Sequence, residues 1–104
     1  MYKSLIIVME ILFFVIGIYA LTLTHETAHQ KILAYNGIDS DIKMNAFGLL
    51  GAETVATTPV DLSDGQYRDV MMLNALNEIY GYQLIIFYTI LVLNLIFLVI
   101  AMKA

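Results

Sequence analysis

The two histidines of this chain lie four residues apart in the pentapeptide His25-Glu26-Thr27-Ala28-His29. Residues at this spacing project from one face of an α-helix, so their imidazoles can bind one zinc ion. Zinc lowers the pKa of a water molecule that it binds toward about 7, and the neighbouring Glu26 can act as a general base. The pattern predicts a zinc peptidase site with His25 and His29 as ligands and Glu26 as the catalytic carboxylate. The alternative is a polar helix end that anchors in the lipid headgroups without a metal.

The chain is short and strongly apolar: 61% of its 104 residues are hydrophobic and 13% are charged. A soluble domain of this length buries too little surface to hide so many apolar side chains, so we expect lipid around them. Residues 5–23 and 84–102 form two apolar runs of the length that a helix needs to cross a bilayer. The net charge of −4 argues against nucleic acid as a partner.

The expected fold is an all-α membrane protein with two antiparallel transmembrane helices joined by an extramembrane loop of about sixty residues. Asn36-Gly37 is typical of a helix end, and Ser63 with Gln66 forms a capping box at a helix start. Lysines near both termini favour cytoplasmic termini. We therefore predict four segments: a first transmembrane helix with an extramembrane extension (4–35), an irregular or hairpin loop (36–62), an extramembrane helix (63–81) and a second transmembrane helix (82–103).

Residues 15–50 resemble the first conserved segment of site-2 proteases, which are intramembrane zinc metallopeptidases. The resemblance rests on H-E-x-x-H at 25–29, Gly37-Ile38 and Phe47-Gly48. It implies that His25 and His29 bind zinc and that Glu26 is the catalytic carboxylate. It also implies a third ligand from an Asp-Gly motif, for which Asp64 before Gly65 is the match. The family core has three spanning helices, whereas this chain has two apolar runs.

Helix geometry brings a different carboxylate to the histidines. If the two transmembrane helices are antiparallel and their outer ends are level, a rise of 1.5 Å per residue places His29 beside Glu78. Asn74 lies four residues earlier on the same helix face, so we expect it to orient that carboxylate. Residues 75–78 (Ala-Leu-Asn-Glu) also resemble the stretch that holds the glutamate ligand in thermolysin-like peptidases. The third ligand is therefore either Glu78, on position, or Asp64, on the family pattern.

Glu10 is the one charged residue within the first apolar run. A carboxyl near the middle of a membrane helix is costly and usually faces protein, water or a partner. The same register places it near Leu98, without a strong partner in the chain. We therefore expect Glu10 to be protonated or to pair with another protein.

Two functions are consistent with these residues. The first is a small membrane zinc metallopeptidase, whose peptide or membrane-protein substrate lies as an extended strand against residues 42–57. The second is a non-catalytic accessory subunit of a larger membrane complex, in which the metal is structural. The expected partners are membrane lipid and either other membrane proteins or further copies of the chain.

Overall fold

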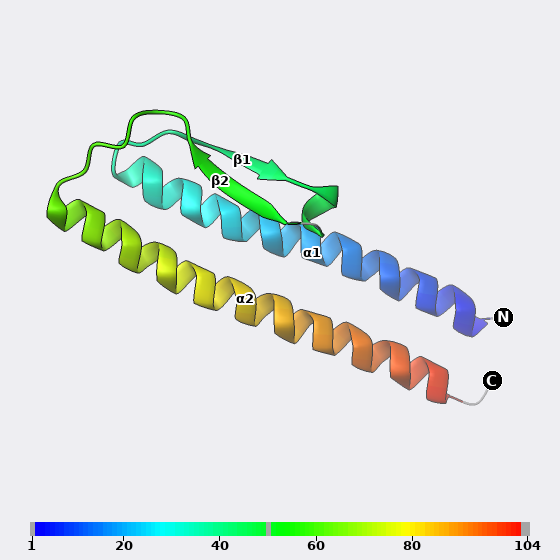
Figure 1. The fold of residues 1–104 in the computed structure, drawn as a ribbon. Helices are drawn as coiled ribbons and strands as arrows, with labels where there is room; N and C mark the ends of the chain where they lie inside the picture. The colour runs from blue at the N-terminus through cyan, green and yellow to red at the C-terminus, as the bar shows by residue number, and fades with distance from the viewer. Residues whose placement is uncertain (1, 50, 103–104) are drawn as a thin grey trace.

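In the computed structural model, the chain forms two long helices that run side by side in opposite directions, with a small β-hairpin lying along the first (Figure 1). The structure describes residues 2–49 and 51–102. The elements in chain order are α1 (Tyr2–Tyr35), β1 (Ser40–Met44), the short 3-10 helix η1 (Ala46–Gly48), β2 (Ala52–Ala56) and α2 (Asp64–Ala101). The fold is mostly helical, and the hairpin falls within the loop predicted for 36–62.

The end of α1 lies where the sequence predicts it. Gly37 adopts a φ of +77°, a left-handed conformation that costs glycine little. Its N–H donates to the carbonyl of Ala34, and the N–H of Ile38 donates to the carbonyl of Leu33, both at 3.0 Å. These two bonds form a Schellman motif, which satisfies carbonyls at the helix end and reverses the chain. The reversal brings the hairpin back along α1.

The hairpin rests on α1 through one face. β1 and β2 pair antiparallel, with Ile42 opposite Thr54. Along β1 the side chains alternate between the α1 side, where Ser40 is buried, and solvent, where Asp41 is exposed. Gln30 of α1 donates from its side chain to the carbonyl of Ser40 at 2.9 Å. The alternation of side chains along the strand thus places one row of hairpin side chains against the helix that carries both histidines.

α2 begins at the predicted capping box and continues through the second apolar run. The Ser63 side chain accepts from the Gln66 N–H, and the Gln66 side chain accepts from the Ser63 N–H. The helices predicted for 63–81 and 82–103 are one uninterrupted helix, and the predicted end at 103 lies outside the described residues. Gly81 does not divide them, because one glycine inside a helix costs only about 1 kcal/mol relative to alanine.

Both helices are long and apolar enough to cross a membrane. Only 11% of the most apolar stretch of each helix is buried, unlike the core helix of a soluble protein, which is mostly buried. The folded chain is 63 Å long, whereas the hydrocarbon core of a bilayer is about 30 Å thick. Roughly half of the helical pair can therefore lie in lipid, with the hairpin end outside it.

A glycine allows the two helices to approach closely within their apolar part. The side chain of Tyr88 from α2 occupies the space that a Cβ on Gly17 would need. Its hydroxyl donates to the carbonyl of Phe13, and its ring stacks on Phe14 with the centroids 5.9 Å apart. Tyr88 therefore defines the position of α2 along α1 at this level.

We predict that Gly17→Ala weakens the helix pair, because the added methyl group must displace Tyr88. The expected loss is about 1–3 kcal/mol of unfolding free energy, the usual cost of overpacking. Gly65→Ala is the control, since a Cβ there meets open space. Unfolding by denaturant in a mild detergent, followed by circular dichroism, measures both variants. Equal stability of the two variants would contradict the tight contact.

Candidate metal centre

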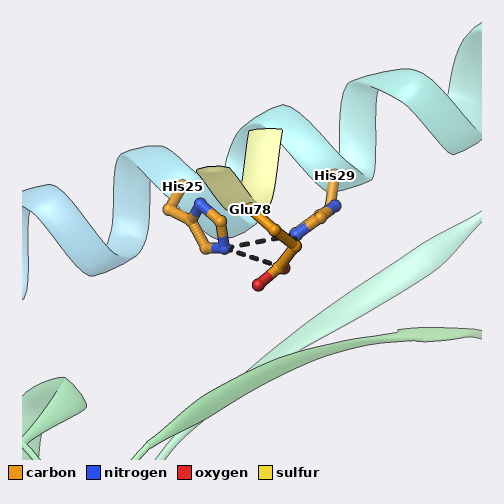
Figure 2. Close-up of side chains that lie close together, drawn as sticks. All are labelled: His25, His29 and Glu78. Carbon is orange, nitrogen blue, oxygen red and sulfur yellow. Dashed lines mark hydrogen bonds and ion pairs between the residues drawn. The ribbon is translucent and has the colours of Figure 1, made fainter. Parts of the chain in front are cut away.

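The two histidines of α1 and Glu78 of α2 converge on one point, as Figure 2 shows. The Nε2 atoms of His25 and His29 are 3.3 Å apart. The Glu78 Oε1 atom lies 3.0 Å from Nε2 of His25 and 2.5 Å from Nε2 of His29. Two imidazole nitrogens and a carboxylate oxygen thus face one another, and the cluster could hold a metal ion.

The donor atoms of the cluster are of the kinds that zinc binds, and one of their three separations matches a zinc site. Zinc in proteins is bound by imidazole nitrogen and carboxylate oxygen at about 2.0–2.2 Å, usually in a tetrahedral arrangement. Two such ligands are therefore about 3.3–3.4 Å apart. The two histidine nitrogens have this separation already. Glu78 lies somewhat closer to them, so its side chain would move outward by less than an ångström. Three protein ligands would leave a fourth position open, as in catalytic zinc sites.

Asn74 orients the ring of His29. The Nδ1–H of His29 donates to Asn74 Oδ1 at 2.6 Å, and Nε2 on the other side of the ring faces Glu78 in the cluster. A hydrogen bond of this kind fixes the tautomer and the angle of a metal-binding histidine. The sequence predicts that Asn74 orients the carboxylate of Glu78, but its contact in the structure is with the imidazole.

The Nδ1 side of the His25 ring is positioned by packing, whereas its Nε2 atom faces Glu78. Its ring occupies the space beside Gly81, where a Cβ would collide with Nδ1. Nδ1 is buried without a hydrogen-bond partner among the described residues. Asn77, one turn before Gly81 on α2, donates from its side chain to the His25 carbonyl at 2.9 Å. Sequence reasoning missed Gly81, although its place three residues after Glu78 puts it on the same helix face.

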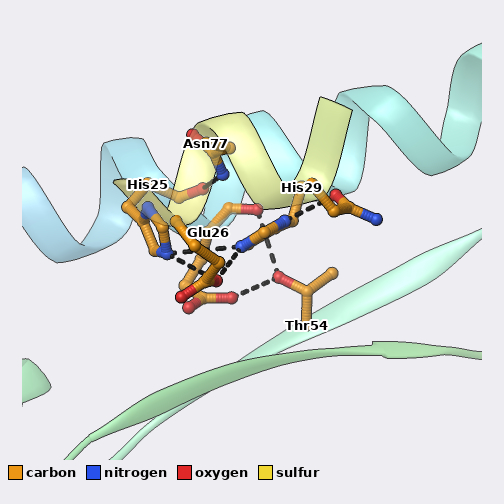
Figure 3. Close-up of polar contacts among 7 residues, drawn as sticks. His25, Glu26, His29, Thr54 and Asn77 are labelled. Carbon is orange, nitrogen blue, oxygen red and sulfur yellow. Dashed lines mark hydrogen bonds and ion pairs between the residues drawn. The ribbon is translucent and has the colours of Figure 1, made fainter. Parts of the chain in front are cut away.

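Glu26 lies beside the cluster and is contacted by the hairpin. It is only 5% exposed, and the hydroxyl of Thr54 on β2 lies 2.5 Å from its Oε2 atom. Figure 3 shows the dashed line that joins the Glu26 side chain to Thr54. A cleft of about 430 Å³ runs along this group and includes Glu26, His29, Thr54 and Glu78 in its lining. No sequence pattern points to Thr54, since its role depends on how the hairpin docks.

The electrostatics of the cluster favour an ionised Glu78. Burial alone would raise the pKa of Glu78, but hydrogen bonds with His29, His25 and Tyr82 outweigh it and lower the pKa below its ordinary value. The stability that these bonds contribute is present above the ordinary pKa and is lost as the pH falls through the lowered one. The side chains of His25 and His29 are 11% and 13% exposed, against 40% for Glu78. The cluster is therefore open to solvent on the Glu78 side.

The other two predicted site residues lie elsewhere. Asp64 is the first residue of α2, fourteen residues and therefore about 21 Å along the helix from Glu78. Glu10 lies in the apolar part of α1, and its Oε2 atom is buried without a hydrogen-bond partner in the part of the chain that the structure describes. Since Gly17 meets Tyr88 and His25 meets Gly81, Glu10 is level with residues 95–96 and not with Leu98. The predicted register holds for His29 and Glu78 near the hairpin end, whereas Glu10 is offset by about three residues from the predicted level.

No protein-family model, curated protein or solved structure matches this chain. What the described residues show is a His–His–Glu group that could hold a metal ion. It lies between α1 and α2; the H-E-x-x-H spacing predicts its two histidines, and the helix rise predicts Glu78, one of the two carboxylates left open, beside them.

We predict that Glu78→Gln abolishes stoichiometric zinc binding, because an amide is a poor ligand, whereas Asp64→Asn retains it. The measurement is zinc per chain in purified protein, by atomic emission after exhaustive dialysis. One zinc in wild type and in Asp64→Asn, with none in Glu78→Gln, is the expected result. The reverse pattern would mean that the structure brings the wrong carboxylate to the histidines.

Proposed function

We propose that this chain is a small integral-membrane zinc metallopeptidase. Its zinc ligands are His25, His29 and Glu78, and Glu26 is its general base. The observation that carries the proposal is the convergence of the H-E-x-x-H histidines with a carboxylate from the opposing helix, next to a cleft that contains Glu26. The resemblance of residues 15–50 to site-2 proteases and of residues 75–78 to thermolysin-like peptidases supports the same reaction.

The proposed site lies at the surface of the membrane. The apolar run 5–23 ends two residues before His25, and the run 84–102 begins six residues after Glu78. The start of α1 and the end of α2 lie at the opposite end of the helical pair, as Figure 1 shows. If lysines near the termini keep them in the cytoplasm, the cleft opens on the other side of the membrane. The substrate would then be a peptide or a membrane-protein segment at that surface.

Zinc in such a site supplies a Lewis acid that activates water and polarises a peptide carbonyl. The protein must supply the proton transfers. Glu26 accepts a proton from the attacking water and returns it to the amine of the leaving peptide. Thr54 limits the mobility of the Glu26 side chain, because its hydroxyl bonds one carboxylate oxygen and leaves the other for this task. The buried position of Glu26 excludes bulk water from that exchange.

The free edge of β2 is suited to hold an extended substrate. Asn45 donates to the carbonyl of Gly51, which places Gly51 among the hydrogen-bonded residues of the hairpin. Because such residues alternate along an antiparallel strand, Ala52 and Thr54 direct their backbone groups away from β1. The cleft lining includes β2 and α2 residues but none of β1, so this edge borders the cleft. A peptide can add there as a third strand.

We predict that Glu26→Gln retains one zinc per chain and loses peptide cleavage by at least about a hundredfold, since general bases typically contribute 10²–10⁴-fold. The assay is mass spectrometry of a peptide library incubated with the zinc-loaded protein in lipid vesicles. Asp41→Asn is the control, because its acid is exposed on β1, which does not line the cleft. Cleavage that survives in Glu26→Gln would remove this residue from the mechanism.

We further predict that Ala52→Pro raises the KM for a cleaved peptide by roughly tenfold, the effect of about one lost hydrogen bond, and changes kcat less. Proline removes the N–H at the free edge but leaves the β1–β2 bonds in place. Ala52→Val is the control, because it enlarges the side chain and keeps the N–H. If valine and proline raise the KM equally, the substrate does not pair with this edge.

A second candidate function is the accessory subunit of a larger membrane complex. The observation that favours it is the buried Glu10 Oε2 atom, which has no hydrogen-bond partner among residues 2–49 and 51–102. In that function the His–His–Glu group holds a structural metal. Wild type and Glu26→Gln would then be alike in every cleavage assay, while both bind zinc.

A further inference from the structure

The side of α2 that faces away from α1 carries a polar residue at the middle of the apolar run. Val92 is 2% exposed and packs toward α1. Asn94 follows two residues later, which is a rotation of about 200° around the helix, and it is exposed. Residues 84–102 are otherwise apolar apart from the hydroxyls of Tyr88 and Thr89, which bond to carbonyls of α1 and α2. Asn94 is thus a carboxamide turned toward lipid near the bilayer centre.

Large apolar side chains flank Asn94 with the spacing of a helix–helix interface. Phe87, Leu91 and Leu98 are 67%, 52% and 60% exposed. With Asn94 they are spaced by four, three and four residues, the heptad pattern that forms a continuous seam on one side of a helix. Figure 1 shows the hairpin along α1, so the described residues leave this seam on α2 uncovered.

A carboxamide in hydrocarbon needs a hydrogen-bond partner, because lipid tails offer none. The amide of Asn has donors and an acceptor, so the same group on a second helix satisfies it. Copies of one chain insert into a membrane in the same orientation, and their α2 helices are therefore parallel. Asn94 then lies at the same depth in both copies, and a twofold axis brings the two amides together.

We propose that the chain forms a parallel homodimer through the seam of Phe87, Leu91, Asn94 and Leu98, with the two Asn94 side chains hydrogen-bonded to each other. The seam lies on the side of α2 opposite α1, whereas the His–His–Glu group lies between the two helices. Each copy therefore keeps its own metal centre and cleft. The proposed dimer requires that α2 crosses the membrane, but it does not require peptidase activity.

The first experiment uses the absence of cysteine from the sequence. Single-cysteine variants in lipid vesicles are oxidised with copper phenanthroline, and cross-linked dimer is measured on a denaturing gel. Leu91→Cys and Leu98→Cys lie in the seam, and Leu93→Cys and Ile100→Cys are exposed controls on another side of the same helix. We expect cross-linking at the two seam positions to exceed the controls at least fivefold. Equal cross-linking at all four positions overturns the proposed interface.

The second experiment tests the hydrogen bond. Energy transfer between donor- and acceptor-labelled chains is followed as the protein is diluted in vesicles. Asn94→Val removes the amide with little change in size, and we expect a dimerisation constant roughly tenfold weaker, the effect of one interhelical hydrogen bond in lipid. Asn94→Gln, which keeps the amide, should stay close to wild type. A monomeric wild type, or equal association of the valine variant, overturns the proposal and leaves this seam to lipid or to another membrane protein.

Discussion

The register between α1 and α2 is the constraint on which the metal centre depends. Two close contacts define it: Tyr88 against Gly17 in the apolar part and His25 against Gly81 near the hairpin end. Both use a glycine to accept a large side chain from the opposite helix. A slip of one turn would move Glu78 by about 5.4 Å and take its carboxylate out of reach of the histidines. The three side chains of the site therefore stay together only while the two helices stay packed in this register.

The hairpin covers the side of the site that the two helices leave open. Two helices alone would leave Glu26 in contact with water on the side away from α2. The docking of β2 covers it, so that a carboxylate beside the histidines is buried and hydrogen-bonded to Thr54. The same strand presents a free backbone edge to the cleft. Glu26 thus comes from α1, whereas β2 supplies both the Thr54 side chain that covers it and the free backbone edge beside the cleft.

α2 has different chemistry on its two sides. Toward α1 it presents Asn74, Asn77, Glu78 and Gly81, which together position the histidines, and further along it presents the apolar residues that pack the helices. Away from α1 it presents lipid-facing side chains interrupted by Asn94. This division allows metal binding and self-association to use the same helix without competing for the same residues.

Local chemistry in the sequence determines the elements and half of the metal centre. Gly37 and Ser63 mark helix boundaries because their effects reach only a few residues, and His25 and His29 share a face because helix periodicity requires it. The choice of Glu78 over Asp64 and the contact of Asn74 with His29 were decided by the tertiary structure. Each depends on how far one helix is shifted along the other, and that shift results from contacts between residues more than fifty positions apart, such as His25 with Gly81. No local pattern carries that information.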